Sequence, residues 1–372
     1  MIRRRFFFLL SGGPDRTPGH PRTRRPGYHR VRACSHALFG LLFLAASVYA
    51  QGPAEQTVPS RQGRFSMTVL NLPNVSGGAG MAIVMQTPSG RTFLYDTGNG
   101  SPENTGTAEW DKLHNSGRDL IAPLLRKREV KAIDGLVVSH AHSDHFGGFI
   151  WLADNFPIRR LWDPGFTLPG QAADDYRGEL GLYAKLRDQY RKRFPEAYQA
   201  VRAGDKLAWD DQLEVEVLSP PKEFFGELVS ETRPKNDTRG HHLINANAIA
   251  LRIRHGKVVF FIVGDIQEDY LKERLWPLLP PEKKKCDVCI LPSHGIHSTK
   301  EEAEATRPAV AVGSVWLPWA KSIPAWRVYP AVGATVYVTG VHGDIEIVSD
   351  GERFTVTTQR EYSAASLAEP KP

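Results

Sequence analysis

Three histidines and one aspartate fall within six consecutive residues, in the stretch His140-Ala-His142-Ser-Asp144-His145. The apolar residues 135–138 directly before it predict a short buried strand. Side chains at alternate positions of an extended segment point the same way, so His140 and His142 can converge on one ion. Asp144 and His145 can then serve a second ion beside it. Because imidazole nitrogen and carboxylate oxygen together suit zinc, manganese or iron, the stretch predicts a site for one or two divalent cations.

The alternative interpretation of this stretch is a solvated polar loop with chance histidines. The whole chain holds 13 histidines, and three of them stand in these six positions beside a carboxylate, which favours the metal site. The pair Gly147-Gly148 directly after the stretch predicts a tight turn of the backbone, with an apolar helix following it.

The bulk composition is that of a globular chain with a real core, because 41% of the 372 residues are hydrophobic and 10% are aromatic. Such a length fits one large or two average domains. Much of the net charge of +6 comes from the first 33 residues, which hold nine Arg and one Asp. The remainder is close to neutral, so a chain-wide charge for binding nucleic acid is not indicated.

The N-terminal residues carry a pattern typical of export. Residues 1–30 are rich in Arg, Pro and Gly, and we expect them to be disordered. Basic residues then precede an apolar run at residues 37–46, and small residues follow it, which predicts a signal peptide cleaved near Ala50. The run is too short for an ordinary membrane span, although an uncleaved anchor is the alternative. We therefore expect residues 1–50 to be a disordered extension plus signal peptide, residues 51–63 to be a polar linker, and the mature protein to be exported without an integral membrane span.

Further polar residues stand at or just after the ends of predicted strands. A strand at residues 92–95 ends at Asp96, one at residues 258–263 ends at Gly264-Asp265, and one at residues 286–291 leads into His294. A carboxylate at the end of a buried apolar strand is costly unless it is paired or bound to a metal, which makes Asp265 a candidate ligand. For Asp96, a plain turn aspartate is the alternative.

Residues 171–203 predict a helical insertion, because Tyr183, Leu186, Tyr190 and Phe194 recur at helical spacing. The other face of this helix is basic. It indicates either a solvated helix face, which is the favoured interpretation, or a flap over an anionic substrate.

The three cysteines, Cys34, Cys286 and Cys289, imply no disulfide framework. Cys286 and Cys289 have the spacing of a metal-binding pair, but they fall within a predicted strand, where they would point to opposite faces. We interpret them as core cysteines. Residues 361–372 predict a disordered tail.

Together with the histidine stretch, the segments Asp96-Thr97-Gly98, Gly264-Asp265 and Ser293-His294-Gly295 resemble the metallo-β-lactamase superfamily over roughly residues 64–350. The resemblance implies an α/β (α+β) fold of four αββα layers, in which two mixed β-sheets are sandwiched between helices. It implies six metal ligands, which are His140, His142, Asp144, His145, Asp265 and His294. It also implies that Asp265 bridges two ions and that Asp96 hydrogen-bonds the ligand loop without binding the metal.

The order and spacing of these segments are similar to those in the metallo-hydrolase domain of the ComEC/Rec2 family of DNA-uptake proteins. That branch carries Asn where β-lactamases carry a third histidine, and Asn245 and Asn247 stand at this place. We expect Asn247 to support the ligands, whereas His241 or His242, just before, is the open alternative for a third histidine ligand. The chain departs from the branch in lacking its His-His-Gly-Ser and Asn-Arg-Tyr-Gly-His-Pro segments.

The resemblance implies metal-assisted hydrolysis, in which the ion activates water for attack on phosphorus or on a carbonyl carbon. Asp144 is then the catalytic residue that orients the water and protonates the leaving group. The favoured substrate is a phosphodiester, either a small molecule or a nucleic acid, and zinc is the favoured cation.

Three other functions stay open. The Asn at the place of the third histidine argues against a β-lactamase or lactonase. A di-iron oxidoreductase needs a carboxylate at that place and usually a flavin domain, and the sequence shows neither. A non-catalytic binding module that retains the fold would be marked by lost ligands, whereas the ligand set here is complete.

Overall fold

The computed structural model describes residues 63–72, 80–100, 115–168, 178–226, 239–267, 270–317 and 319–361. All of them belong to one compact unit of the chain, Pro59–Pro372. The predictions for residues 1–50, for nearly all of the linker and for the tail after residue 361 lie outside the described residues and stay predictions. No helix within the described ranges is long and apolar enough to cross a membrane.

Two mixed β-sheets form the centre of this unit. The first has the strand order β14-β13-β1-β2-β3-β4-β5-β6. Its strands are β1 (Phe65–Val69), β2 (Ala82–Gln86), β3 (Thr92–Thr97), β4 (Gly135–Val137), β5 (Leu161–Asp163), β6 (Tyr198–Ala200), β13 (Ile345–Ser349) and β14 (Phe354–Thr358). Neighbours from β14 to β3 pair antiparallel, and neighbours from β3 to β6 pair parallel.

The second sheet has the strand order β12-β11-β10-β9-β8-β7. Its strands are β7 (Leu213–Ser219), β8 (Ala250–His255), β9 (Val258–Ile262), β10 (Val288–Ile290), β11 (Val310–Gly313) and β12 (Thr335–Val338). Neighbours from β12 to β9 pair parallel, whereas β9, β8 and β7 pair antiparallel.

Apolar side chains from both sheets meet in one core between them. The rings of Phe65 and Phe260 lie 5.1 Å apart across this core, and those of Phe93 and Trp209 stack at 4.5 Å. Each sheet also buries its outer face under helices. Strands that are buried on both faces explain why β4, β9 and β10 read as continuous apolar runs.

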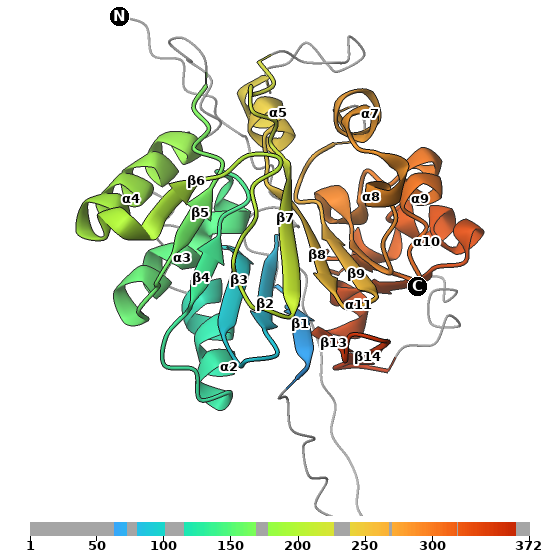
Figure 1. Ribbon diagram of the computed structural model, residues 1–372, viewed down its shortest axis with the longest axis horizontal. Coiled ribbons are helices and arrows are strands. Elements are labelled where there is room, and N and C mark those ends of the chain that lie inside the picture. The colour runs from blue at the N-terminus through green and yellow to red at the C-terminus, as the bar shows by residue number, and fades with distance from the viewer. Residues whose placement is uncertain are drawn as a thin grey trace, which may run out of the picture. The chain divides into compact units, whose positions relative to one another are not determined.

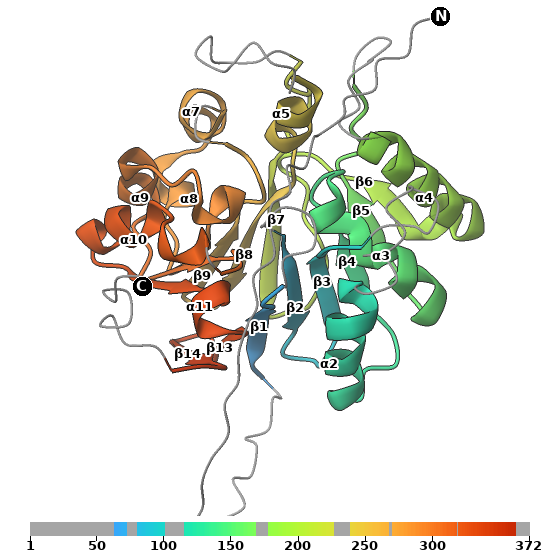
Figure 2. The same cartoon turned by 180° about the vertical axis from the view of Figure 1, so that it is seen from behind.

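Helices cover the two outer faces (Figures 1 and 2). Over the first sheet lie α2 (Ala122–Lys127), α3 (Ser143–Asn155) and α4 (Glu179–Arg193). The other helices are α5 (Arg239–Ala246), α7 (Trp276–Leu278), α8 (Pro281–Lys284), α9 (Lys300–Thr306), α10 (Ala325–Val328) and α11 (Thr339–His342), most of which accompany the second sheet. The predicted fold class of two mixed sheets between helices is therefore confirmed.

The predicted turn at Gly147-Gly148 is wrong, because both residues lie inside α3, which begins at Ser143. The glycines serve close packing instead. A Cβ atom on Gly147 would lie 2.1 Å from the backbone nitrogen of Gly100, and one on Gly148 would lie 2.3 Å from the carbonyl oxygen of Thr97. The absence of side chains lets α3 press against the segment that follows β3.

The strand predicted at residues 245–253 is also partly wrong. Residues up to Ala246 belong to α5, and the strand β8 begins at Ala250. Asn247 ends the helix, since its side-chain amide donates to the carbonyl oxygen of Leu243 at 2.9 Å. The predicted strand is therefore too long at its start, because Asn247 closes a helix and does not belong to a strand.

Within the described residues of the predicted insertion, α4 and a short 3₁₀ helix, Pro195–Ala197, lead into β6, which extends the first sheet parallel to β5. Tyr183 and Tyr190 pack against Phe146 and Phe149 of α3. Most of the basic side chains are exposed, as the solvated-face interpretation expects. Arg187 differs, because it lies 3.7 Å from the buried carboxylate of Asp163.

The close approach of α3 to Thr97 predicts whether replacing Gly148 lowers or raises the free energy of unfolding. Alanine in a helix interior is ordinarily more favourable than glycine by about 0.5–1 kcal/mol. Gly148→Ala should instead lower the free energy of unfolding by about 1–3 kcal/mol, because its methyl group overlaps the Thr97 carbonyl. Urea denaturation measures this, with Gly226→Ala as the control, since a Cβ atom there meets nothing within 4 Å. A stabilised Gly148→Ala variant would contradict this packing.

Candidate metal centre

The candidate ligands follow the carboxyl ends of strands in both sheets. His140 and His142 lie in the loop after β4, and His142 is the N-cap residue of α3. Asp144 and His145 stand in the first turn of that helix. Asp265 follows β9, and His294 lies in the short 3₁₀ helix Pro292–Gly295 after β10.

The structure brings these residues together in two adjoining groups. The ligand atoms of His140, His145 and Asp265 all lie within 4.8 Å of one another. Those of Asp144, His145 and His294 do so as well. The ring of His142 lies 4.7 Å from that of His140, centroid to centroid. All six candidate ligands thus meet at the edge where the two sheets abut, although their role as ligands stays a prediction.

The distances between these atoms fit donors that share a cation. Two donors at about 2.0–2.2 Å from one tetrahedral ion lie roughly 3.2–3.6 Å apart. Asp265 Oδ1 is 3.5 Å from His145 Nε2, and Asp265 Oδ2 is 3.2 Å from His294 Nε2. Because its two oxygens face histidines on different segments, the Asp265 carboxylate has the arrangement of a bridging ligand.

Buried nitrogen and oxygen atoms also lack partners at this place. Within the described part of the chain, Nε2 of His140, Nε2 of His145 and Oδ1 of Asp265 are buried without a hydrogen bond. Unpaired buried polar atoms are costly, and native proteins leave few of them. A divalent cation would satisfy all three atoms at once, so the donor set fits such an ion.

Asp96 fixes two of the histidines from outside the group. Its Oδ2 atom accepts a hydrogen bond from the Ser139 hydroxyl at 2.7 Å and lies 2.7 Å from Nδ1 of His145. The Ser139 hydroxyl in turn lies 2.8 Å from Nδ1 of His140. Since that hydroxyl donates to Asp96, it can only accept from His140, which places the proton of His140 on Nδ1 and leaves Nε2 for a metal.

The backbone around the ligands adopts conformations that ordinary residues avoid. Asp96, Ser293 and His294 have positive φ angles of 57°, 44° and 62°. The surrounding structure holds the second of these, because the Ser293 amide donates to the Gly264 carbonyl at 2.9 Å and its hydroxyl donates to the Asp265 carbonyl at 3.2 Å. These bonds tie the two distant ligand segments together, and strained backbone of this kind clusters at functional sites.

Burial and neighbouring charges shift the pKa values of the histidines in opposite directions. Burial and the adjacent imidazoles lower the pKa of His140 and of His142 well below the usual value. Burial also opposes a charge on His145, but the carboxylates of Asp265, Asp144 and Asp96 raise its pKa well above the usual value. His140 and His142 are therefore neutral near pH 7, which is the form that binds a metal.

His241 adjoins this group, whereas His242 has another neighbour. The rings of His241 and His142 lie 4.2 Å apart at an angle of 30°. His242 Nδ1 lies 2.7 Å from the side-chain oxygen of Gln267. Of the two histidines that the sequence left open, the structure places His241 beside the ligands.

Asn247 does not occupy the supporting position that the sequence predicted for it. Its side chain is hydrogen-bonded to the backbone of Phe225, at 2.9 Å in both directions, and to Leu243. The side chain of Asn245, two residues earlier, acts against the lowering of the pKa of His142. Of the two asparagines, Asn245 is therefore the one that lies near the candidate ligands.

Cys286 and Cys289 are buried, as core cysteines should be, and neither forms a disulfide. Their predicted orientation is wrong, however, because both side chains belong to the same apolar cluster and contact each other. The strand β10 begins only at Val288, so the alternation of strand side chains does not extend to Cys286.

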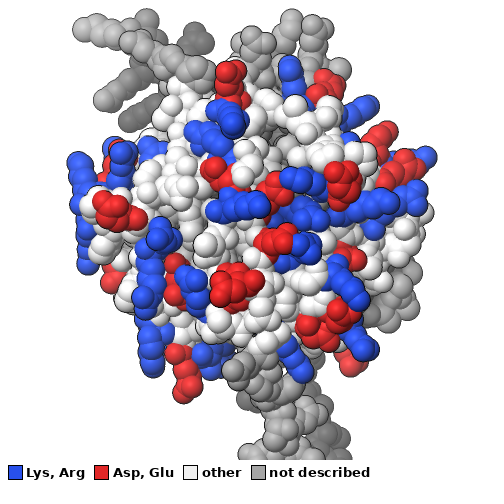
Figure 3. Space-filling view, viewed as in Figure 1, with Lys and Arg blue, Asp and Glu red and all other residues white. Residues whose placement is uncertain are grey.

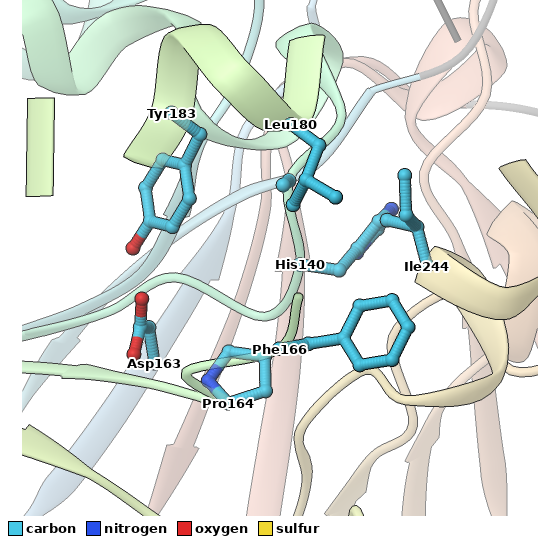
Figure 4. Close-up of a pocket in the computed structure, with 8 residues that line it drawn as sticks. His140, Asp163, Pro164, Phe166, Leu180, Tyr183 and Ile244 are labelled. Atoms are coloured by element: carbon cyan, nitrogen blue, oxygen red, sulfur yellow. The ribbon is translucent and has the colours of Figure 1, made fainter. Parts of the chain in front are cut away.

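A small cavity borders His140 on the side of α4 (Figure 4). Its wall is mostly apolar and includes Phe166, Leu180 and Ile244. The buried Asp163 carboxylate lies at one end, with the Tyr183 hydroxyl pointing toward it in Figure 4. Sequence reasoning missed Asp163, although it stands at a strand end like Asp96. It also missed Ser139, whose signal was a hydroxyl beside the first histidine of the stretch.

Comparisons with known proteins show what this chain is similar to. A family model described as the metallo-beta-lactamase superfamily matches residues 75–298, a range that contains every candidate ligand. A search of the curated proteins finds no match. Among solved structures, the chain is similar to a mutant of the CmlA beta-hydroxylase, with 16% identity and a TM-score of 0.39 over 74% of this chain and 54% of that one.

Two further structures are similar at the same level. A diphosphatase from the PhnP family shares 14% identity with a TM-score of 0.38, over 77% of this chain and 98% of that one. CmlA from Streptomyces venezuelae, a diiron beta-hydroxylase, shares 16% identity with a TM-score of 0.35, over 74% of this chain and 47% of that one. The chain spans about half the length of the two CmlA chains.

The hydrogen bonds of Asp96 predict how metal affinity responds to its removal. Asp96→Asn retains the shape but cannot accept from both Ser139 and His145 in the same way, so metal affinity should fall about 10–100-fold. Ser139→Ala should cause a smaller fall, because it frees only His140. Zinc titration against a chromophoric chelator measures both. Unchanged affinity in Asp96→Asn would show that this carboxylate does not orient the ligands.

Proposed function

The chain belongs to the metallo-β-lactamase superfamily, and on that premise we propose that it is a metal-dependent hydrolase. The observation that carries the proposal is the convergence of buried Nε2 atoms of His140 and His145 on the Asp265 carboxylate, at a place where these atoms form no hydrogen bond within the described residues. Their separations match those of ligands to a shared cation.

In this proposal, each residue of the centre has a part that follows from its position. A divalent cation bound there supplies the Lewis acidity that makes water reactive near neutral pH. His140 and His145 present Nε2 to it, and the carboxylate of Asp265 lies between the histidine groups. The side chain of Asp144 is 24% exposed, more than the side chains of His145, Asp265 and His294. It is therefore suited to accept the proton of the attacking water and return it to the leaving group.

We infer that zinc is the preferred ion, because the donors are mainly imidazoles with two carboxylates. Manganese and iron take the same donor types and are the alternatives. One or two ions would fit, because the candidate ligands form two adjoining groups, and Nε2 of His145, which belongs to both, would bind only one of the ions.

We propose a phosphodiester as the substrate, either a small molecule or a nucleic acid, because the order of the sequence motifs is similar to that of the ComEC/Rec2 family. Basic and acidic side chains are interspersed over the face shown in Figure 3. The substrate proposal therefore rests on the order of the motifs and on the candidate metal centre, and not on the charge of this face.

We also propose that the protein is exported and acts outside the cytoplasm. The support is the apolar run at residues 37–46 followed by small residues up to Ala50, which has the form of a signal peptide. N-terminal sequencing of the mature protein tests this, and a first residue well before Gln51 would contradict it.

A lactonase or β-lactamase is the second candidate, and one contact favours it. The sequence placed Asn where these enzymes carry a third histidine, but His241 lies with its ring 4.2 Å from that of His142. A histidine is thus near the third position after all. Assays with nitrocefin and with an acyl homoserine lactone separate this candidate from a phosphodiesterase.

The proposal predicts hydrolysis of bis(p-nitrophenyl) phosphate or a related diester in the presence of zinc or manganese. Asp144→Asn should lower kcat about 100–10,000-fold through loss of acid–base catalysis. His142→Ala should lose both activity and bound metal. His255→Ala is the matched control, because His255 is equally buried but bonds to Ser349 outside the centre, and it should retain activity.

Two results would count against this function. Equal turnover by wild type and His142→Ala would remove the metal from the reaction. Metal binding without hydrolysis of any diester, lactone or β-lactam would favour the binding module instead.

A further inference from the structure

The helix that carries Asp144 and His145 has no cap of its own. The N-cap residue of α3 is His142, whose side chain makes no capping hydrogen bond. The first N–H groups of a helix have no partner within the helix and need one from elsewhere. Here the partner comes from another element, because Glu179 Oε2 accepts from the backbone amide of Ser143 at 2.7 Å. Its second oxygen accepts from the Ser143 hydroxyl at 3.1 Å.

Glu179 is well placed for a fixed interaction of this kind. It is the first residue of α4 and is only 8% exposed. A buried carboxylate is costly unless its charge is compensated. This one lies in the first turn of its own helix and also at the N-terminus of α3, and both helix ends favour a negative charge. A single side chain thus joins the starts of two helices.

The contact lies within the ligand stretch itself. Ser143 stands between His142 and Asp144, so any rotation of the first turn of α3 moves the atoms of the second group of candidate ligands. The next residue of α4, Leu180, lines the cavity beside His140 (Figure 4). The start of α4 therefore contacts the ligand stretch at Ser143 and borders the cavity that His140 lines.

We propose that Glu179 is a positioning residue of the metal centre. By holding Ser143 at two points it fixes the first turn of α3, and so fixes Asp144 and His145 at the distances that one cation requires. This inference rests on the proposed metal-dependent function. The competing role is purely structural, in which Glu179 only fastens α4 to the rest of the fold.

Cobalt(II) titration of the full chain distinguishes the two roles, because the d–d absorption reports both affinity and coordination geometry. Glu179→Ala should bind cobalt about 10–100-fold more weakly than wild type and show an altered spectrum. Glu179→Gln should lose less, since its amide oxygen still accepts one of the two bonds from Ser143. If only the bulk of the side chain mattered, Glu179→Gln would bind cobalt as tightly as the wild type.

Asp134→Asn is the matched control. Asp134 accepts from the backbone amide of Thr92 at 2.8 Å, a comparable bond, at the end of β4 that is remote from the ligands. Thermal unfolding in EDTA gives the stability of each variant without metal. We expect the variants at Glu179 and the variant at Asp134 to have a lower Tm than the wild type. Only the variants at Glu179 should also bind cobalt more weakly.

The outcomes separate this inference from the function on which it rests. Failure of the wild type to bind cobalt would overturn both. Wild-type binding with an unchanged affinity and spectrum in Glu179→Ala would overturn the positioning role alone. An equal loss of affinity in Asp134→Asn would also overturn it, because the effect would then be general destabilisation.

Discussion

Histidine nitrogens and a carboxylate oxygen converge at one edge of this fold, buried and without hydrogen bonds among the described residues, and one cation can satisfy them together. The chain brings them there from segments more than a hundred residues apart, since His140 and Asp265 belong to different sheets. The core between the sheets holds those segments in place, with the Tyr95 hydroxyl donating to the Ile249 carbonyl across it at 2.5 Å. Packing of the two sheets is thus what creates the site.

Precision within the site comes from residues that do not bind the ion. Asp96 holds His145 directly and His140 through Ser139. One carboxylate thus orients a candidate ligand in the loop after β4 and another in the first turn of α3. Gly147 and Gly148 let the ligand helix approach the loop after β3. Glu179 holds the start of the same helix from the opposite side. Contacts from several segments of the fold therefore hold the candidate ligands in place.

The sequence predicted the parts of the site that local pattern encodes. Asp265 and His294 were identifiable because each follows an apolar run that could only be a buried strand. The roles of Ser139 and Glu179 were not identifiable, because a serine or a glutamate forms such contacts only where the fold brings a partner near. The predicted strand starts too early, at residue 245 and not at Ala250, for a similar reason. Asn245 and Asn247 suit a helix end and a loop equally well, so the local sequence does not mark where the helix ends.

Anomalous X-ray diffraction from a crystal of the zinc-loaded protein, measured on both sides of the zinc absorption edge, tests the shared cation most directly. One or two peaks should lie within bonding distance, about 2.0–2.2 Å, of Nε2 of His140 and His145 and of the carboxylate of Asp265. A peak at His294 Nε2 should accompany them if two ions bind. Zinc bound only elsewhere, with these atoms joined to each other or to water, would contradict the metal centre.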